Sequence, residues 1–184
     1  EIFLDITGSH HLFGGPDEMA RTIKKTVKEE LGINCTIGIG PNILIAKLAS
    51  DLAKPDGLRW IDKSMVSSVF QSLPVKKLWG IGPHTEEKLR AMGIRTCGEL
   101  GAAPLSVLTK KFGVLGGQLK AMGNGILDRP LESADRDPKS IGHSRTFEKD
   151  LWHREDIEPQ LLRLSEMVGR RARRYGYKGK KITL

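Results

Sequence analysis

The sequence predicts an α+β protein, and three observations support this fold class. In the first third of the chain, strand-like segments alternate with amphipathic helical segments, which is typical of an α/β sheet region. The middle third carries short helical patterns that glycine and proline repeatedly interrupt. The last quarter predicts one strand, one long helix and a final strand that is cut short, so a second, truncated α/β region follows.

The first part of the chain, residues 1–61, is expected to form an incomplete sheet with helices packed on it. Asp17 and Glu18 favour the start of a helix, and Gly32 favours its end. Between them, apolar residues recur every three or four positions, as they do on one face of a helix. The expected elements in chain order are a strand at 2–6, a helix at 17–31, a strand at 33–39, a helix at 41–52 and a strand at 58–61.

Residues 62–127 are expected to form a small helical domain that contains a helix-hairpin-helix. Gly80 and Gly82 flank one apolar residue, so the turn can approach a phosphate with its amide hydrogens as donors. Pro83 suits the first turn of the next helix, whose N-terminus adds a partial positive charge. The pattern predicts binding of a nucleic-acid backbone; a helical hairpin without a ligand is the alternative. The expected contacts come from Gly80, Ile81, Gly82, Thr85 and Lys88.

The charge distribution agrees with a polyanionic partner. The 184 residues carry a formal net charge of +8, which gives a broad positive field without identifying the partner. Basic residues cluster after Pro159 against a single acid, Glu166, and such clusters make binding sensitive to salt. An ordinary solvated helix face is the alternative. The clustered residues are Arg163, Arg170, Arg171, Arg173, Arg174, Lys178, Lys180 and Lys181.

The last part of the chain is expected to begin with a linker at 128–139, where charged residues and two prolines gather. A strand at 140–147, a helix from about 157 to 174 and a strand-like end at 181–184 follow. The chain begins with Glu1 rather than methionine, and its last segment has the pattern of a strand cut short. We therefore expect a fragment of a longer protein.

The sequence carries few signs of metal binding, redox chemistry or membrane insertion. Cys35 and Cys97 belong to no paired metal-ligand motif, so a reduced, cytosolic protein is expected. No apolar run approaches the roughly 20 residues that cross a bilayer. On a strand, Asp5 would lie about 13 Å from Glu1, too far to share one ion, so Asp5 is expected to be structural. The histidines without ligand partners at useful spacing are His10, His11 and His84.

Four motifs occur in an informative order along the chain. They are EIFLDIT at 1–7, IGIGPN at 37–42 with AKLAS at 46–50 and KPDG at 54–57, the hairpin LWGIGP at 78–83, and KSIGH at 139–143 with TF at 146–147. In this order, they resemble the Y-family of translesion DNA polymerases, closest to the DNA polymerase IV type. The second motif, which is similar to a signature of the family's palm domain, is the most specific.

The resemblance implies an organisation and a function. It implies the C-terminal part of the palm at 1–61, the thumb at 62–127, a linker at 128–139 and the N-terminal part of the little finger at 140–184. The implied function is that of a template-dependent, low-fidelity DNA polymerase for translesion synthesis and repair. Primer–template DNA and a deoxynucleoside triphosphate are the implied partners, together with a sliding clamp reached through a C-terminal tail. Such a protein works in the bacterial cytoplasm, at the nucleoid.

The resemblance also implies which palm residues act. Glu1 matches the family's catalytic glutamate, which binds Mg²⁺. The reaction needs two Mg²⁺ ions, and in the family the other ligands are acidic residues that precede this motif. One carboxylate cannot organise two ions, so these residues alone are expected to be inactive as a polymerase. Lys54 matches the lysine that contacts the phosphates of the incoming nucleotide; a helix-dipole role is the alternative. Lys47 is expected to be structural, and Ile43 stands where the family commonly has lysine.

In the little finger, the resemblance implies a strand beside the template backbone, with donors that meet successive phosphates. The expected donors are Ser140, His143, Ser144, Arg145 and Thr146. Aromatic residues are sparse there, so sequence-tolerant binding is expected. Two alternatives remain open: a non-catalytic accessory protein similar to the Y-family, and a repair nuclease or ligase module that uses the same hairpin. The latter leaves residues 41–57 and 140–147 unexplained.

Overall fold

The computed structural model describes residues 1–127, 130–131 and 138–184, and it divides the chain into two compact units. The first unit spans Glu1–Glu132 and the second spans Ser133–Leu184, and each is described by itself. Most of the predicted linker at 128–139 lies outside the described residues. The predicted domain boundary after residue 61 falls inside the first unit and stays a prediction.

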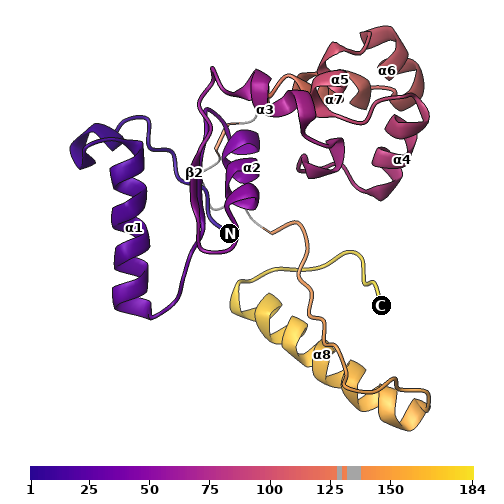
Figure 1. Cartoon of the computed structure of the whole chain (residues 1–184). Coiled ribbons are helices and arrows are strands. Elements are labelled where there is room, and N and C mark those ends of the chain that lie inside the picture. The colour runs from indigo at the N-terminus through magenta and orange to yellow at the C-terminus, as the bar shows by residue number, and fades with distance from the viewer. Residues whose placement is uncertain (128–129, 132–137) are drawn as a thin grey trace. The chain divides into compact units, whose positions relative to one another are not determined.

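The N-terminal part of the first unit is dominated by one helix (Figure 1). A short 3₁₀ helix, η1 (His10–Phe13), precedes α1 (Pro16–Leu31), which ends at Gly32 with a φ of 70°. The predicted helix is confirmed, but the predicted strand at 2–6 is wrong. That segment is irregular because the described part of the chain offers no strand beside it, and the carbonyl of Ile6 instead accepts hydrogen bonds in a local turn.

A parallel two-stranded sheet and one helix form a β-α-β unit. β1 (Ile37–Ile39) pairs with β2 (Leu58–Trp60), and α2 (Ile43–Ala53) connects them. Strands therefore form within both predicted segments, the first being shorter than predicted. A Cβ atom on Gly38 would lie 2.1 Å from the carbonyl oxygen of Ala46. The bare backbone at Gly38 is what lets α2 lie directly on β1.

Asn42 joins this β-α-β unit to the end of the helical region. Its Oδ1 accepts a hydrogen bond from the amide of Ile45 at 3.1 Å, which caps the N-terminus of α2. Its Nδ2 donates to the carbonyl oxygen of Gly125 at 2.8 Å. One side chain thus fixes both the start of a helix and a contact with a segment far along the chain.

Residues 62–127 are helical, as predicted. The elements are α3 (Val66–Ser72), the 3₁₀ helix η2 (Val75–Lys77), α4 (Pro83–Ala91), α5 (Cys97–Ala102), α6 (Leu105–Phe112) and α7 (Leu115–Gly123). A capping box begins α5, where Thr96 and Glu99 accept hydrogen bonds from each other's backbone amides. Figure 1 shows α4, α5, α6 and α7 gathered at one end of the first unit, with α5 and α7 side by side and α3 between this group and α2.

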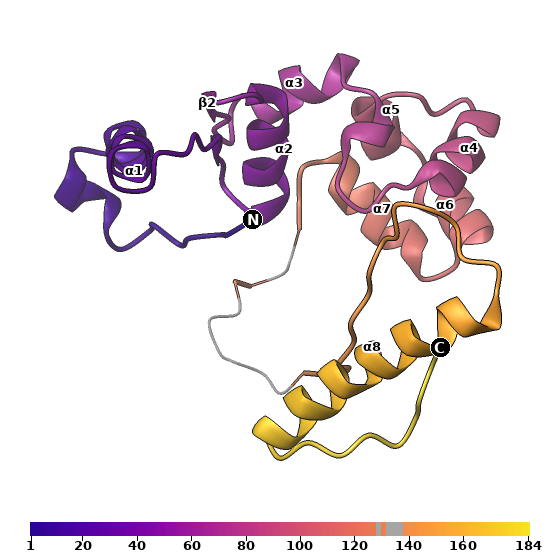
Figure 2. The same cartoon turned by 90° about the horizontal axis from the view of Figure 1, so that it is seen from below.

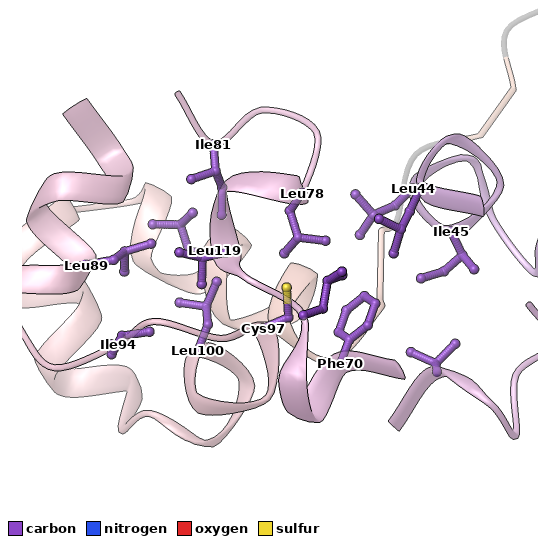
Figure 3. Close-up of a cluster of buried hydrophobic side chains, with 14 of the residues drawn as sticks. Leu44, Ile45, Phe70, Leu78, Ile81, Leu89, Ile94, Cys97, Leu100 and Leu119 are labelled. Atoms are coloured by element: carbon purple, nitrogen blue, oxygen red, sulfur yellow. The ribbon is translucent and has the colours of Figure 1, made fainter. Parts of the chain in front are cut away.

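One continuous hydrophobic core runs through the first unit (Figure 3). Leu44 and Ile45 of α2 contribute one end of this cluster, Phe70 of α3 lies next to them, and Leu100 of α5 lies farther into the helical region. Cys97 belongs to the same cluster, and burial raises the pKa of its thiol to about 12. The thiol therefore stays protonated and serves as a small apolar core group.

The second unit is built around one long helix, α8 (Arg154–Arg174), which Figure 2 shows with an irregular segment on either side of it in the chain. The predicted helix is confirmed and begins a few residues earlier than expected. The strands predicted at 140–147 and 181–184 are wrong, because no described segment pairs with either of them. Among the described helices, none is both long and apolar enough to cross a membrane.

Candidate functional site

One face of α2 carries a row of alternating charges. Lys47, Asp51 and Lys54 follow one another at helical spacing, so their side chains project on the same side. The ammonium group of Lys47 donates a hydrogen bond to the carboxylate of Glu1 and lies 3.5 Å from Asp51 Oδ1. The ammonium of Lys54 donates to the same oxygen of Asp51 at 2.7 Å. Glu1 and Lys54, the two predicted palm residues, thus lie at opposite ends of this charged row.

The contacts within this charged row favour the ionised forms of Lys47 and Asp51. The hydrogen bond to Glu1 raises the pKa of Lys47, partial burial opposes this, and the negative charges of Asp51 and Glu1 add to the rise. For Asp51, burial disfavours the charged form. The hydrogen bond from Lys54 and the charges of both lysines outweigh that effect, so the pKa of Asp51 is lowered. Lys47 and Asp51 are therefore ionised at neutral pH.

Lys54 occupies the exposed end of this row. It is the residue at which α2 ends, and its side chain is 56% exposed. The turn that follows fits closely against the helix, since a Cβ atom on Gly57 would lie 2.0 Å from the carbonyl oxygen of Ala53. The amide of Ile37 also donates to the carbonyl of Gly57 at 3.1 Å. Lys54 is thus an exposed cation on a firmly held backbone.

The described residues do not by themselves complete a metal centre. Glu1 is the one predicted metal ligand, and its carboxylate is paired with Lys47. The other carboxylate of the row, Asp51, is held by two lysines. No group of three or more His, Cys, Asp or Glu side chains gathers anywhere in the described part of the chain. Asp5 accepts a hydrogen bond from the amide of Thr7 at 2.9 Å, and this local bond lowers the pKa of Asp5.

The hairpin forms a second candidate site, at the start of α4. Gly80 has a φ of 93°, a conformation that glycine adopts without strain, and the side chain of Ile81 is buried in the core. Gly82 is exposed at the N-cap position, and Pro83 is the first helical residue. A Cβ atom on Gly82 would meet nothing within 4 Å. The backbone at Gly82 is therefore open to an approaching ligand.

The side chains around the hairpin suit an anion. Lys88 is exposed on α4, and Thr85 is partly exposed one turn before it. The amide of Thr85 already donates to the carbonyl of Gly82 at 3.0 Å, so its hydroxyl is the group that remains for a ligand. Within the described residues, no hydrogen bond uses the amide of Gly80 or Gly82. Both glycines are exposed, and the positive end of the α4 helix dipole lies at Gly82.

An aromatic contact joins the two sites. The rings of Phe3 and Trp79 stack with their centroids 6.1 Å apart and an angle of 29° between their planes. Phe3 lies two residues after Glu1, and Trp79 immediately precedes Gly80. The segment that carries the predicted catalytic glutamate is thus packed against the turn that carries the predicted phosphate-binding glycine.

The predicted donors of the little finger lie in the second unit. Ser144, Arg145 and Thr146 are exposed, as is Ser140, while His143 is partly buried. These residues lie on an irregular segment rather than on the predicted strand. The guanidinium carbon of Arg145 lies 5.8 Å from the centre of the Phe147 ring, which holds the arginine by a cation–π contact.

Comparisons with known proteins match nearly all of this chain. Residues 1–51 match the impB/mucB/samB family, residues 138–184 match the C-terminal domain of that family, and residues 76–125 match the thumb domain of DNA polymerase-iota. The chain is also 38% identical over 174 residues to the DNA repair protein homolog YobH of Bacillus subtilis. That alignment covers 90% of this chain and 79% of YobH.

The chain belongs to the impB/mucB/samB family. It is also similar to DNA polymerase IV of Moorella thermoacetica, with 42% identity over 185 residues, and to DNA polymerase IV 2 of Bacillus subtilis, with 39% identity over 189 residues. Each alignment covers 100% of this chain and 46% of the relative. The resemblance to Y-family polymerases is thereby confirmed, and the chain spans less than half the length of these two relatives.

The family matches include the hairpin and the charged row except Lys54, which lies outside the matched residues. The charged row from Glu1 to Asp51 lies within the first match, and the hairpin lies within the thumb match. Sequence reasoning missed Asp51, although its spacing from Lys47 and Lys54 could have signalled an ion-paired helix face. It also missed the stacking of Phe3 on Trp79, for which an aromatic residue next to a glycine turn was the available signal.

Proposed function

We propose that the full-length gene product is a template-dependent, low-fidelity DNA polymerase that synthesises past damaged bases. We also propose that the residues described here bind primer–template DNA through its sugar–phosphate backbone. Similarity to DNA polymerase IV proteins along the entire chain supports the activity. The observation that carries the DNA-binding part is the open backbone at Gly82, at the positive end of α4.

In this proposal the hairpin binds a phosphate by its backbone. The amides near Gly82 donate to phosphate oxygens, Lys88 adds a positive charge, and the hydroxyl of Thr85 donates a further hydrogen bond. Because these groups recognise phosphates and not base edges, binding tolerates any sequence. In the second unit, Ser140, His143, Ser144, Arg145 and Thr146 make the same kind of contact with the template strand.

Lys54 is proposed to bind the triphosphate of the incoming deoxynucleotide. Its exposed ammonium exchanges Asp51 for an oxygen of the triphosphate, which as a whole carries more negative charge than one carboxylate. Asp51 keeps its other partner, Lys47, when Lys54 moves away. Lys47 also holds the carboxylate of Glu1, so the exchange leaves no buried charge without a partner.

Glu1 is proposed to be the catalytic carboxylate of the metal site. In nucleotidyl transfer, a pair of Mg²⁺ ions activates the primer hydroxyl and stabilises the departing pyrophosphate. The described residues supply one ligand for such a pair, and no metal position follows from their geometry. A sliding clamp is a further proposed partner, and DNA as the substrate would place the protein at the bacterial nucleoid.

Primer extension tests the proposed activity. The full-length gene product is assayed with Mg²⁺ and four deoxynucleotides beside a variant in which only Glu1 is changed to Gln. Extension that disappears in Glu1→Gln supports the polymerase and the role of Glu1. A folded protein that binds primer–template but extends nothing would favour a non-catalytic DNA-binding accessory protein instead.

Gly82→Val tests the hairpin. Gly82 has a φ of −83° and open space around it, so valine is compatible with the fold but blocks the approach of a phosphate. We expect duplex affinity to fall about tenfold, which corresponds to the loss of one charge-assisted hydrogen bond. Fluorescence anisotropy with labelled primer–template measures this. Gly117→Val is the matched control, since Gly117 is also exposed with open space around it; equal affinities of the two variants would disprove the mechanism.

A further inference from the structure

Lys24 is a largely buried lysine that the proposed function leaves without a role. It lies in α1, and its side chain is only 22% exposed. Its ammonium group donates to the carbonyl oxygen of Cys35, to the carbonyl oxygen of Asp56 at 2.9 Å and to Asp56 Oδ1 at 2.6 Å. An ammonium group has three N–H donors, so these acceptors use its full capacity.

The acceptors lie at one edge of the sheet. Cys35 precedes β1 and Asp56 precedes β2, and the two strands are parallel, so both strands begin at this edge. The same edge receives the C-terminus of α2, where Lys54 lies two residues before Asp56. Lys24 therefore connects α1 to the turn that follows Lys54.

The turn held by Lys24 has a backbone that needs support. Asp56 has a φ of 47°, a left-handed conformation that few residues with a side chain adopt and that aspartate adopts when its polar side chain is hydrogen-bonded. Lys24 supplies hydrogen bonds to both the carbonyl and the carboxylate of this residue. It also neutralises the Asp56 carboxylate, which would otherwise add a negative charge to the turn that follows Lys54.

We propose that Lys24 is a positioning residue for the nucleotide site. It fixes the turn at 55–57, and thereby the direction in which Lys54 leaves the end of α2. The inference rests on the proposed contact of Lys54 with a triphosphate, and nothing in the proposed function itself requires Lys24. A positioning residue acts through another group, so its effect must depend on Lys54.

Single-nucleotide insertion by the full-length gene product tests this dependence. Lys24→Met should raise the KM for the incoming deoxynucleotide about fivefold, because a displaced Lys54 binds the triphosphate less well. Affinity for primer–template should stay unchanged. Lys24→Arg, which keeps the charge and several donors, should restore most of the affinity for nucleotide. Lys25→Met is the matched control on the same helix, since the Lys25 side chain is 74% exposed and its one ion pair among the described residues is with Glu29, at 3.9 Å.

A double-mutant cycle separates this inference from the proposed function. If Lys24 acts through Lys54, Lys24→Met adds little to the KM of a Lys54→Met variant. An unchanged KM in Lys54→Met overturns the proposed role of Lys54 and the inference with it. A raised KM in Lys54→Met with no change in Lys24→Met overturns the inference alone. An equal rise from Lys24→Met in both backgrounds also overturns it.

Amide hydrogen exchange provides a readout that is independent of polymerase activity. The amide of Ile37, which donates to the carbonyl oxygen of Gly57 at 3.1 Å, should exchange faster in Lys24→Met than in the Lys25→Met control, since the turn loses its restraint. Unchanged exchange there would overturn the inference. If Lys24→Met does not fold, Asp56→Asn removes the same ion pair from the side of the turn without altering α1. Faster exchange and a raised KM in that variant support the inference, and wild-type values oppose it.

Discussion

The side chain of Glu99 caps the N-terminus of α5. Its Oε2 accepts hydrogen bonds from the amides of Arg95 at 2.7 Å and Thr96 at 2.9 Å. These bonds, with that of Arg95 the stronger, lower the pKa of Glu99. A group whose pKa is lowered in the folded state stabilises the fold above its ordinary pKa. That contribution disappears as the pH falls through the lower, folded-state value.

Glu99→Gln should therefore lower the free energy of unfolding at neutral pH, since a neutral amide is a weaker acceptor than a carboxylate. The difference from the unchanged protein should vanish as the pH falls through the folded-state pKa of Glu99. Urea unfolding over a series of pH values measures both effects. Glu87→Gln serves as the control, because Glu87 is exposed on α4. A difference that persists in acid would contradict the prediction.

Packing between elements depends on two glycines where α5 meets α7. A Cβ atom on Gly123 would lie 2.4 Å from the amide nitrogen of Gly101, and one on Gly101 would lie 2.7 Å from the carbonyl oxygen of Gly123. The two backbones are therefore in direct contact. Lys120 strengthens the same junction by donating to the carbonyl oxygens of Gly101 and Ala103, at 2.9 and 2.7 Å.

Gly123→Ala should destabilise the first unit, because a methyl group at this position meets backbone that cannot move aside. We expect a decrease of about 1–3 kcal/mol in the free energy of unfolding, as for other overpacked cores. Chemical denaturation provides the measurement. In Gly117→Ala, on the same helix, the added methyl group meets open space, so that variant should be neutral or slightly more stable. Equal stability of the two variants would show that the α5–α7 junction is loose.

At the scale of the whole molecule, the proposed DNA binding depends mainly on the positive charge of the protein. The C-terminal end of α8 carries four exposed arginines, Arg170, Arg171, Arg173 and Arg174. Each arginine that neutralises a phosphate releases counterions from the DNA. The number of phosphates that the protein neutralises is therefore measurable from the salt dependence of binding.

Changing these four arginines to glutamine should flatten the plot of log affinity against log salt concentration. We expect the steepness of this plot to fall by about 0.9 for each phosphate that the variant no longer neutralises. Titrations of labelled duplex at several salt concentrations measure it. A control in which Arg21, Lys25 and Lys28 of α1 are neutralised should keep the original slope. If the α8 variant also keeps it, this end of α8 faces solvent in the complex.

The sequence predicted the helices better than the strands, and the reason is physical. In α1 and α8, the acidic residues of the first turn, the basic residues of the last turn and the apolar spacing all lie within the helix, so a local pattern contains most of the information. A strand needs a neighbour, and the segments at 2–6 and 140–147 have none in the described residues. Their apolar composition could not show this.

The parts of the candidate site that depend on residues close together in the sequence were predictable. The spacing of Gly80 and Gly82 around a buried residue predicted the turn that the structure contains. The contacts of Lys47 with Glu1 and of Lys24 with Asp56 join residues 46 and 32 positions apart. Such pairs depend on how the elements pack, so no pattern in one sequence could reveal them.

The side-chain amide of Asn42 restricts which residues can occupy position 42. Its oxygen accepts a hydrogen bond from the first turn of α2, and its nitrogen donates one to the carbonyl oxygen of Gly125. The side chain must therefore be both an acceptor and a donor. Aspartate can only accept, and serine is too short to reach both partners. In a mutational scan, this position would therefore tolerate neither its closest isostere nor the usual helix caps. If substitutions of Asn42 are not tolerated, the cause would be the loss of the contact between α2 and the segment at Gly125, and not the loss of a contact with a ligand.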